Sequence, residues 1–235
     1  MDMNSIMLNS MNKRPSIIFD IDGTLLYARG VGREAFGVAF EAAYNTPYPD
    51  VRKLYFVGAT DSNIVRTMAQ ECNLENTTAQ EEHFFLRLTQ EIDQGLSQTK
   101  PHIYPGVPQL LAALREAGLP LGIVTGNIRP TAWSKLRHAG IDRFFSFGAY
   151  GDDHHDRCEI TKIARARAPS HAPIAMLIGD TPLDIKAAKS NNLVALATAT
   201  GWVSAAELAA AGADLVLPDF SDTQGCLAQI LALLD

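Results

Sequence analysis

The chain has 235 residues, of which 47% are hydrophobic and 20% charged, which is ordinary for a globular protein and excludes a disordered one. At about 150 residues per domain, this length predicts one large domain or one domain with an insert. The 26 acidic residues outnumber the 20 basic ones, and the net charge is −6. Because binding to nucleic acid or to an anionic membrane needs a basic surface, we expect neither as a partner.

The cysteines and the ends of the chain indicate a compartment. Cys72, Cys158 and Cys226 are far apart and form no CxxC pair, which fits reduced thiols. Residues 1–14 are rich in Asn and Met and contain no apolar run of signal-peptide length, so we interpret them as a flexible tail. No stretch reaches the ~18 apolar residues of a membrane span. We therefore expect a cytoplasmic protein, while its oligomeric state is not readable from the sequence.

The first predicted element is a short strand over residues 16–20 (SIIFD), and a long helical segment follows it. From about residue 30 to 100 we find helical patterns but no convincing strand pair. Asp61 is a candidate cap for one helix, and Thr78 with Glu81 predicts a capping box for another. The apolar stripes of the three predicted helices are Ala35, Phe36, Ala39 and Ala43; Ile64, Val65 and Met68; and Phe85, Leu88, Ile92 and Leu96. This segment is predicted to be a small helical bundle.

After residue 100, apolar runs of strand length alternate with helical patterns. The runs cover residues 119–125, 144–147, 174–179 and 193–197. Such continuous runs are typical of strands buried on both faces of a parallel sheet. Pro182 marks the start of a helix, and Ser204 with Glu207 forms a capping box before another. The alternation predicts an α/β fold with a Rossmann-like, doubly wound parallel sheet.

The most informative motif is Asp20-Ile21-Asp22-Gly23-Thr24, directly after the first strand. Ligands of parallel sheets bind at the carboxyl ends of the strands. Two carboxylates at this place can share one metal ion and one substrate. An Asx-rich turn is the alternative interpretation, but a turn has no need of the first carboxylate at the end of a buried strand.

Polar residues also end two later strands. Thr125-Gly126-Asn127 forms a Gly-containing turn whose amides can hold an anion, and Asp180 is followed one helical turn later by Asp184. Each of these groups alone is explained about as well by helix capping. Together they place polar groups at a single edge of the sheet, which capping alone does not explain.

With these motifs in this order, the sequence resembles the phosphatases of the haloacid dehalogenase (HAD) superfamily, in the branch similar to phosphoglycolate phosphatase. The resemblance covers nearly everything after Arg14. It implies a HAD-like α/β core over residues 15–27 and 101–235 and a helical cap domain over 28–100. It also implies a Mg²⁺-dependent phosphatase that hydrolyses the phosphate monoester of a small metabolite through a phospho-aspartate.

The resemblance also implies roles for individual residues. Asp20 is expected to be the nucleophile and Asp22 the general acid and base. The expected magnesium ligands are Asp20, Asp180 and the backbone carbonyl of Asp22. The phosphate is expected to contact the motif Thr125, Gly126 and Asn127 together with a basic residue. Thr24 and Asp184 are expected to orient the residues around them.

The basic residue departs from the family pattern, which usually supplies a lysine between the third and fourth strands. Arg157 lies at the matching distance from the following helix, and Lys162 is the alternative one turn later. The neighbouring His154 and His155 lack the usual spacing of metal ligands, which disfavours a second metal site there.

The same motif discriminates between the related activities of this superfamily. Dehalogenases and phosphonate-cleaving relatives lack the second acid, so Asp22 argues against both. A sugar phosphomutase keeps both acids and stays an alternative, as does, in a different class, a catalytically silent module that binds a phosphate ligand. A binding module has no need of a nucleophile beside an acid, so we place it last.

The cap contains one candidate specificity loop, Gly58-Ala59-Thr60, which leads into the helix begun by Asp61. Its amides and the Thr60 hydroxyl are candidates to face the site. In related phosphatases this loop often carries a lysine where this chain has Ala59. The difference argues against a substrate whose carboxylate needs a cationic partner, phosphoglycolate included. Capping by Asp61 with a simple turn at Gly58 is the alternative interpretation.

Overall fold

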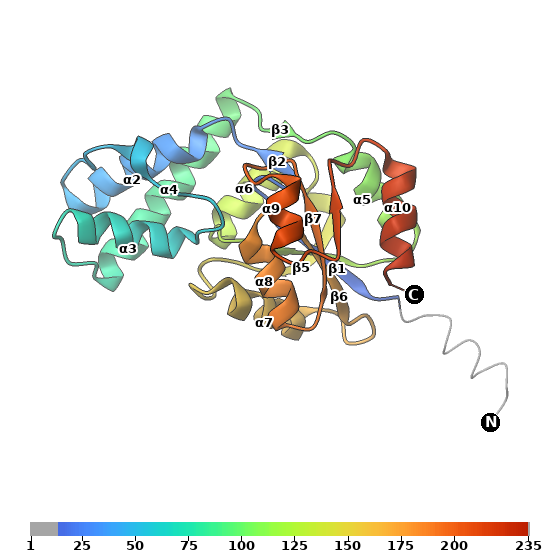
Figure 1. Ribbon diagram of the computed structural model, residues 1–235. Helices are drawn as coiled ribbons and strands as arrows, with labels where there is room; N and C mark the ends of the chain where they lie inside the picture. Colours follow the sequence, from blue (N-terminus) through green and yellow to red (C-terminus); the bar gives the residue numbers. More distant parts are fainter. Residues whose placement is uncertain (1–13, 235) are drawn as a thin grey trace, which may run out of the picture.

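The computed structural model describes residues 14–234, so nearly all of the predicted tail lies outside the described residues. Its centre is a six-stranded parallel sheet with strand order β5-β4-β1-β6-β7-β8 (Figure 1). The strands are β1 Ser16–Phe19, β4 Leu121–Val124, β5 Phe145–Ala149, β6 Ile174–Gly179, β7 Val194–Thr198 and β8 Leu215–Leu217. The predicted α/β fold class is confirmed.

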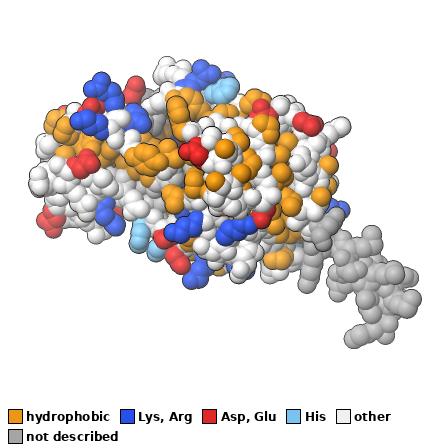
Figure 2. Space-filling view, viewed as in Figure 1, with side chains coloured by type: hydrophobic (Ala, Val, Ile, Leu, Met, Phe, Trp, Pro, Cys, Tyr) orange, Lys and Arg blue, Asp and Glu red, His pale blue; other side chains and the backbone are white. Residues whose placement is uncertain are grey.

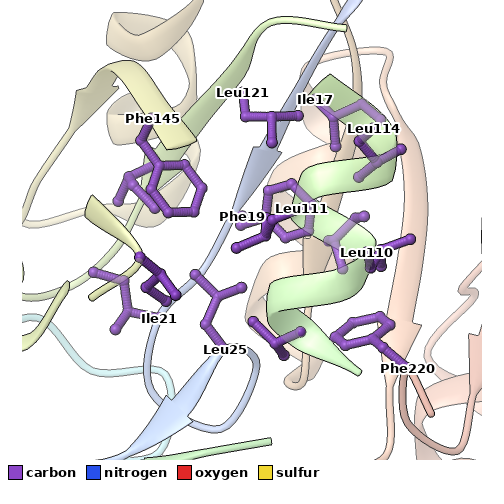
Figure 3. Packing of buried hydrophobic residues seen from close by; sticks show 14 of the residues in the cluster. Ile17, Phe19, Ile21, Leu25, Leu110, Leu111, Leu114, Leu121, Phe145 and Phe220 are labelled. Atoms are coloured by element: carbon purple, nitrogen blue, oxygen red, sulfur yellow. The ribbon is translucent and has the colours of Figure 1, made fainter. Parts of the chain in front are cut away.

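Helices cover both faces of this sheet, which is why its central strands are apolar throughout. One face packs against α5 (Val107–Glu116), α6 (Arg129–Ala139) and α10 (Thr223–Ala232), and the other against α7 (Arg157–Arg167), α8 (Pro182–Ser190) and α9 (Ala205–Ala210). All four residues of β1 are buried, and β1 pairs with β4 on one side and β6 on the other. Figure 3 shows Leu110, Leu111 and Leu114 of α5 lying against Ile17 and Phe19 of β1.

The helical insert forms its own hydrophobic cluster beside the sheet. It contains α2 (Val31–Tyr44), the short helix η1 (Val51–Lys53), α3 (Asp61–Glu71) and α4 (Thr78–Gln98). The chain enters and leaves it through a two-stranded antiparallel ladder of β2 (Leu26–Tyr27) and β3 (His102–Ile103). Figure 1 shows these helices at one end of the molecule, away from the terminal helix α10. Because the ladder stands next to residues 28 and 100, we propose these as the limits of a cap domain.

Several local expectations differ from the structure. Thr77 with Gln80, rather than Thr78 with Glu81, forms the capping box of α4. The buried stripe of this helix therefore begins at Phe84, and Phe85 is only partly buried. The two-residue ladder and β8 were not predicted, because strands of two or three partly exposed residues carry almost no pattern. The Ser204–Glu207 capping box and the position of Pro182 in the first turn of α8 are confirmed.

One further segment completes the description. The short helix η2 (Asp142–Phe144) leads into β5 at the amino end of that strand. Among the described residues, we find no helix that is both long and apolar enough to cross a membrane.

Candidate active site

Asp20 follows the central strand directly, and its position is fixed by the sheet. Its amide donates to the carbonyl of Ile178 on the neighbouring β6 at 2.9 Å, and its side chain is buried. The chain then turns at Gly23, which has φ +88°, a conformation that L side chains rarely adopt. A β-carbon at Gly23 would also overlap the carboxylate of Asp180. Glycine is therefore required where the first motif passes the end of β6.

Three carboxylates meet at this edge of the sheet. Oxygen atoms of Asp20, Asp180 and Asp184 all lie within 4.8 Å of one another. The Thr24 hydroxyl donates to Asp180 Oδ1 at 2.9 Å. Asp184 is the third residue of α8, and its Oδ2 accepts from the amide and hydroxyl of Thr181 at 3.1 and 2.6 Å. Asp184 therefore belongs to the capping box of α8, as the capping interpretation of the sequence predicts. It also faces the acidic cluster.

Arg157 offsets part of this negative charge. It is the first residue of α7, is buried, and its Nη1 lies 3.0 Å from Asp20 Oδ1 and 2.9 Å from Asp184 Oδ1. Burial by itself lowers the pKa of Arg157, but Asp20 and Asp184 outweigh it and raise that pKa. Lys162, the alternative basic residue, is exposed and pairs with Glu159. Of the two candidates, the structure brings Arg157 to the site.

The electrostatic balance of the site remains unfavourable for so many carboxylates. Burial raises the pKa of Asp20 to about 6, with Arg157 acting in the opposite direction and Asp184 adding to the rise. Burial and the neighbouring Asp184 also raise the pKa of Asp180 well above its usual range. Although Arg157 Nη1 is 3.0 Å from Asp20 Oδ1, the angle does not suit a hydrogen bond, so Asp20 Oδ1 and Arg157 Nε are both buried without a hydrogen-bond partner among the described residues. Buried polar atoms normally have partners, so this arrangement has room for a bound cation and a bound anion.

Asp22 lies in a second network, which contains a residue that sequence reasoning missed. Lys135 Nζ donates to Asp22 Oδ2 and to Asn127 Oδ1, both at 2.6 Å. Asn127 Nδ2 donates to Asp22 Oδ2 at 2.7 Å and to the Thr125 hydroxyl at 2.8 Å. Only 7% of the Lys135 side chain is exposed, against 42% for Asp22. The available signal was that Lys135 falls on the same helical stripe as the buried Ala132 and Leu136.

The cap loop Gly58-Ala59-Thr60 rests on the Thr125-Gly126-Asn127 turn of the core. The Asp61 amide donates to the Gly126 carbonyl at 2.8 Å, and a β-carbon at Gly126 would overlap the Ala59 carbonyl. Thr60, not Asp61, is the N-cap of α3, and its hydroxyl accepts from the Asn63 amide at 3.3 Å. Gly58, Ala59 and Asp61 line a cavity that also contains Asp20 and Arg157. The Thr60 side chain is instead buried at the start of its helix.

These two networks and the cap loop enclose one cavity of about 600 Å³. The core residues of its lining that the sequence singled out are Asp20, Asp22, Gly23, Thr125, Gly126, Asn127, Arg157 and Asp180. His154 and His155 stack on each other, and His154 Nδ1 accepts from the Asp156 amide at 3.0 Å. The acidic cluster, rather than this histidine pair, therefore has the geometry of a metal site within the described chain.

Comparison with known proteins shows the family of this chain. The family model of haloacid dehalogenase-like hydrolases matches residues 17–198. A phosphoglycolate phosphatase from Synechococcus elongatus is 30% identical over 147 residues, which cover 62% of this chain and 69% of that protein. A phosphoglycolate phosphatase from Vibrio cholerae is 27% identical over 227 residues, covering 92% and 96%. The crystal structure of CbbY from Rhodobacter sphaeroides in complex with phosphate has a TM-score of 0.69 at 21% identity, covering 89% and 96%.

The chain belongs to the haloacid dehalogenase-like hydrolases, in their phosphoglycolate-phosphatase-like branch. The resemblance found in the sequence motifs is confirmed, and with it the assignment as an enzyme of the phosphoric monoester hydrolase type.

Proposed function

We propose that the protein is a magnesium-dependent phosphatase that hydrolyses a small phosphate monoester through a phospho-aspartate on Asp20. The observation that carries this proposal is the placement of Asp20, which is buried at the end of the central strand and lies at the floor of the cavity. Asp180 stands beside it on one side and Arg157 on the other.

The donor set fits a magnesium ion. Mg²⁺ prefers oxygen ligands and is usually held by one or two carboxylates, with substrate oxygens and waters completing the set. Asp20 and Asp180 supply such carboxylates, and a cation beside them would offset the burial and mutual repulsion that raise the pKa of both. We propose Asp20, Asp180 and the backbone carbonyl of Asp22 as the ligands. Asp184 is committed to Arg157 and Thr181 and would act by orienting them. When bound, the ion would offset the repulsion between anionic substrate and nucleophile.

In the first step, a carboxylate oxygen of Asp20 attacks the phosphorus, and the bond from phosphorus to the leaving oxygen breaks. Asp22 gives its proton to that oxygen, so the leaving group departs as a neutral alcohol. In the second step, Asp22 takes a proton from a water molecule, which attacks the same phosphorus. The phosphorus–Asp20 bond then breaks and the carboxylate is restored. The partly exposed Asp22 and its anchor to Asn127 are consistent with both tasks.

The phosphoryl oxygens need donors during both steps. The Arg157 Nε lacks a hydrogen-bond partner within the described chain, and the Thr125 hydroxyl and the Gly126–Asn127 turn line the same cavity. We propose that these groups hold the transferring phosphoryl group. Charge-assisted hydrogen bonds of this kind are among the strongest in proteins.

Turnover of 4-nitrophenyl phosphate tests this function. We expect activity that rises with added Mg²⁺, is abolished by chelator and returns with the metal. Asp20→Asn should lower kcat by about 10³-fold or more, as is usual for loss of a nucleophile. Asp142→Asn, at the opposite end of the strands, is the control and should keep full activity. Near-wild-type turnover by Asp20→Asn would refute the mechanism, and isomerised sugar phosphate in place of free phosphate would indicate a mutase.

A further inference from the structure

The cavity is larger than the proposed chemistry requires. Its volume of about 600 Å³ lies in the range of roughly 300–1,000 Å³ that holds a drug-sized ligand. Asp20 and its neighbours occupy only the floor, where a phosphoryl group and a metal ion would bind. The remaining volume lies between the cap and the core and would surround the leaving group.

Aromatic side chains from four separate segments line this cavity. They are Tyr27 of β2, Tyr55 after η1, Tyr104 after β3 and Trp202 after β7. Trp202 is 83% exposed and Tyr55 74% exposed, which is unusual for side chains of this size. Figure 2 shows apolar side chains gathered on the face where the cap helices meet the core. We call these four residues the aromatic rim.

The cations of the cavity already have partners. Lys135 binds Asp22 and Asn127, and Arg157 binds Asp20 and Asp184. Arg33 donates through Nη1 to the carbonyls of Val51 and Leu54 at 2.6 and 3.0 Å, just before Tyr55. Its guanidinium also stacks on Phe56, 4.7 Å from the ring centroid. Arg33 therefore holds the segment that carries Tyr55, and the leaving group would meet a mixture of aromatic and aliphatic surface.

Exposure differs strongly along the cavity lining. Asp20 is 4% exposed, whereas Trp202 and Tyr55, at 83% and 74%, are the most exposed of the large hydrophobic side chains among the described residues. A base joined to the phosphate through a sugar carries its aromatic face several bonds away from the phosphate, and aromatic side chains of this kind stack well with nucleobases.

We propose that the substrate is a nucleoside 5′-monophosphate, whose base stacks on the aromatic rim while its phosphate binds at Asp20. This inference rests on the proposed phosphatase function. It disfavours small carboxylated phosphates, since they have no apolar face for the rim to cover.

The test compares a ribonucleoside 5′-monophosphate with ribose 5-phosphate in the presence of Mg²⁺. In both compounds the phosphate is bonded to the 5′ oxygen of a ribose, and only the nucleotide carries a base. Stacking of one base predicts that kcat/KM is about tenfold or more higher for the nucleotide. Trp202→Ala and Tyr55→Ala should each lower the ratio of the two kcat/KM values severalfold and bring it toward one in combination.

Leu86→Ala is the matched control, because Leu86 is a 61% exposed apolar residue of α4 that lines a different hollow on the cap. It should leave the ratio unchanged. A ratio of one or below in the wild-type enzyme, or equal losses on both substrates in the rim variants, would overturn this inference. Turnover of 4-nitrophenyl phosphate by the same sample separates the two failures: its absence refutes the phosphatase, and its presence with a ratio of one refutes only the nucleotide.

Discussion

The side chain of Asp61 in the cap accepts a hydrogen bond from the backbone amide of Ile128 in the core at 2.9 Å. The Asp61 amide donates to Gly126 in return, so the cap loop and the phosphate loop are joined in both directions. The Asp61 carboxylate is buried at this junction, and burial raises its pKa to about 7. The nearby Lys135 offsets only part of that rise.

This pKa predicts a pH-dependent stability. Between pH 4 and 7 the unfolded chain ionises at Asp61 while the folded chain stays protonated, so folding loses stability as pH rises through this window. Asn at this position keeps an acceptor for Ile128 and does not ionise. We expect Asp61→Asn to gain about 3 kcal/mol relative to wild type between pH 5 and pH 8.5, since the folded pKa of about 7 lies about two units above pH 5 and one pKa unit is worth about 1.4 kcal/mol. Urea unfolding at the two pH values measures this, and an unchanged difference would contradict it.

Lys135 is expected to position Asp22. Lys135→Met removes the ammonium that holds Asp22 Oδ2 and Asn127 Oδ1. General acid–base catalysis contributes about 10²–10⁴-fold, so partial misplacement of Asp22 should lower kcat about 10–100-fold. KM should change less than kcat, because Lys135 contacts the Asp22 carboxylate directly and reaches the phosphate-binding turn only through the Asn127 side chain. The exposed Lys100→Met is the control, and a rise in KM without loss of kcat would point to direct substrate binding instead.

Gly23 is expected to tolerate no side chain. Gly23→Ala combines an unfavourable positive φ, worth about 1 kcal/mol, with overlap on Asp180, worth about 1–3 kcal/mol. We expect a loss of about 2–4 kcal/mol in the free energy of unfolding, with activity reduced at least about tenfold because Asp180 is displaced. Gly212→Ala is the matched control, since Gly212 has φ +93° and no atom within 4 Å of a β-carbon. Equal losses in the two variants would show that overlap with Asp180 costs nothing.

Two neighbouring residues of the cap loop are expected to have different roles, Ala59 in substrate specificity and Thr60 in helix stability. Ala59 lines the cavity, so Ala59→Leu should change the ranking of substrates more than the turnover of 4-nitrophenyl phosphate. Thr60 caps α3, so Thr60→Val should cost about 1 kcal/mol of stability and affect all substrates alike. Parallel kinetics on a nucleotide, a sugar phosphate and the aryl phosphate distinguish these outcomes. The reverse pattern would place the specificity role at Thr60.

The sequence predicted the sheet and its catalytic edge because both depend on local patterns. Strands buried on two faces are apolar throughout, and the residue after such a strand must lie at the edge of the sheet. Asp20, Thr125 and Asp180 could therefore be expected to lie close together. The identity of the basic residue near Asp20 was left between Arg157 and Lys162, since both are near the start of one helix.

Tertiary structure decided the remaining features. The buried Lys135 looks from the sequence like any charged helical residue, and only the packing of α6 under the first motif gives it Asp22 as a partner. The exchange of hydrogen bonds between Asp61 and the 126–128 segment joins parts of the chain more than 60 residues apart. The aromatic rim likewise draws on four segments that share no motif. By itself the sequence determined which strand ends bring polar side chains to one edge of the sheet, because burial of a strand follows from local periodicity. Which side chains meet above them was decided by long-range packing, which leaves no local pattern.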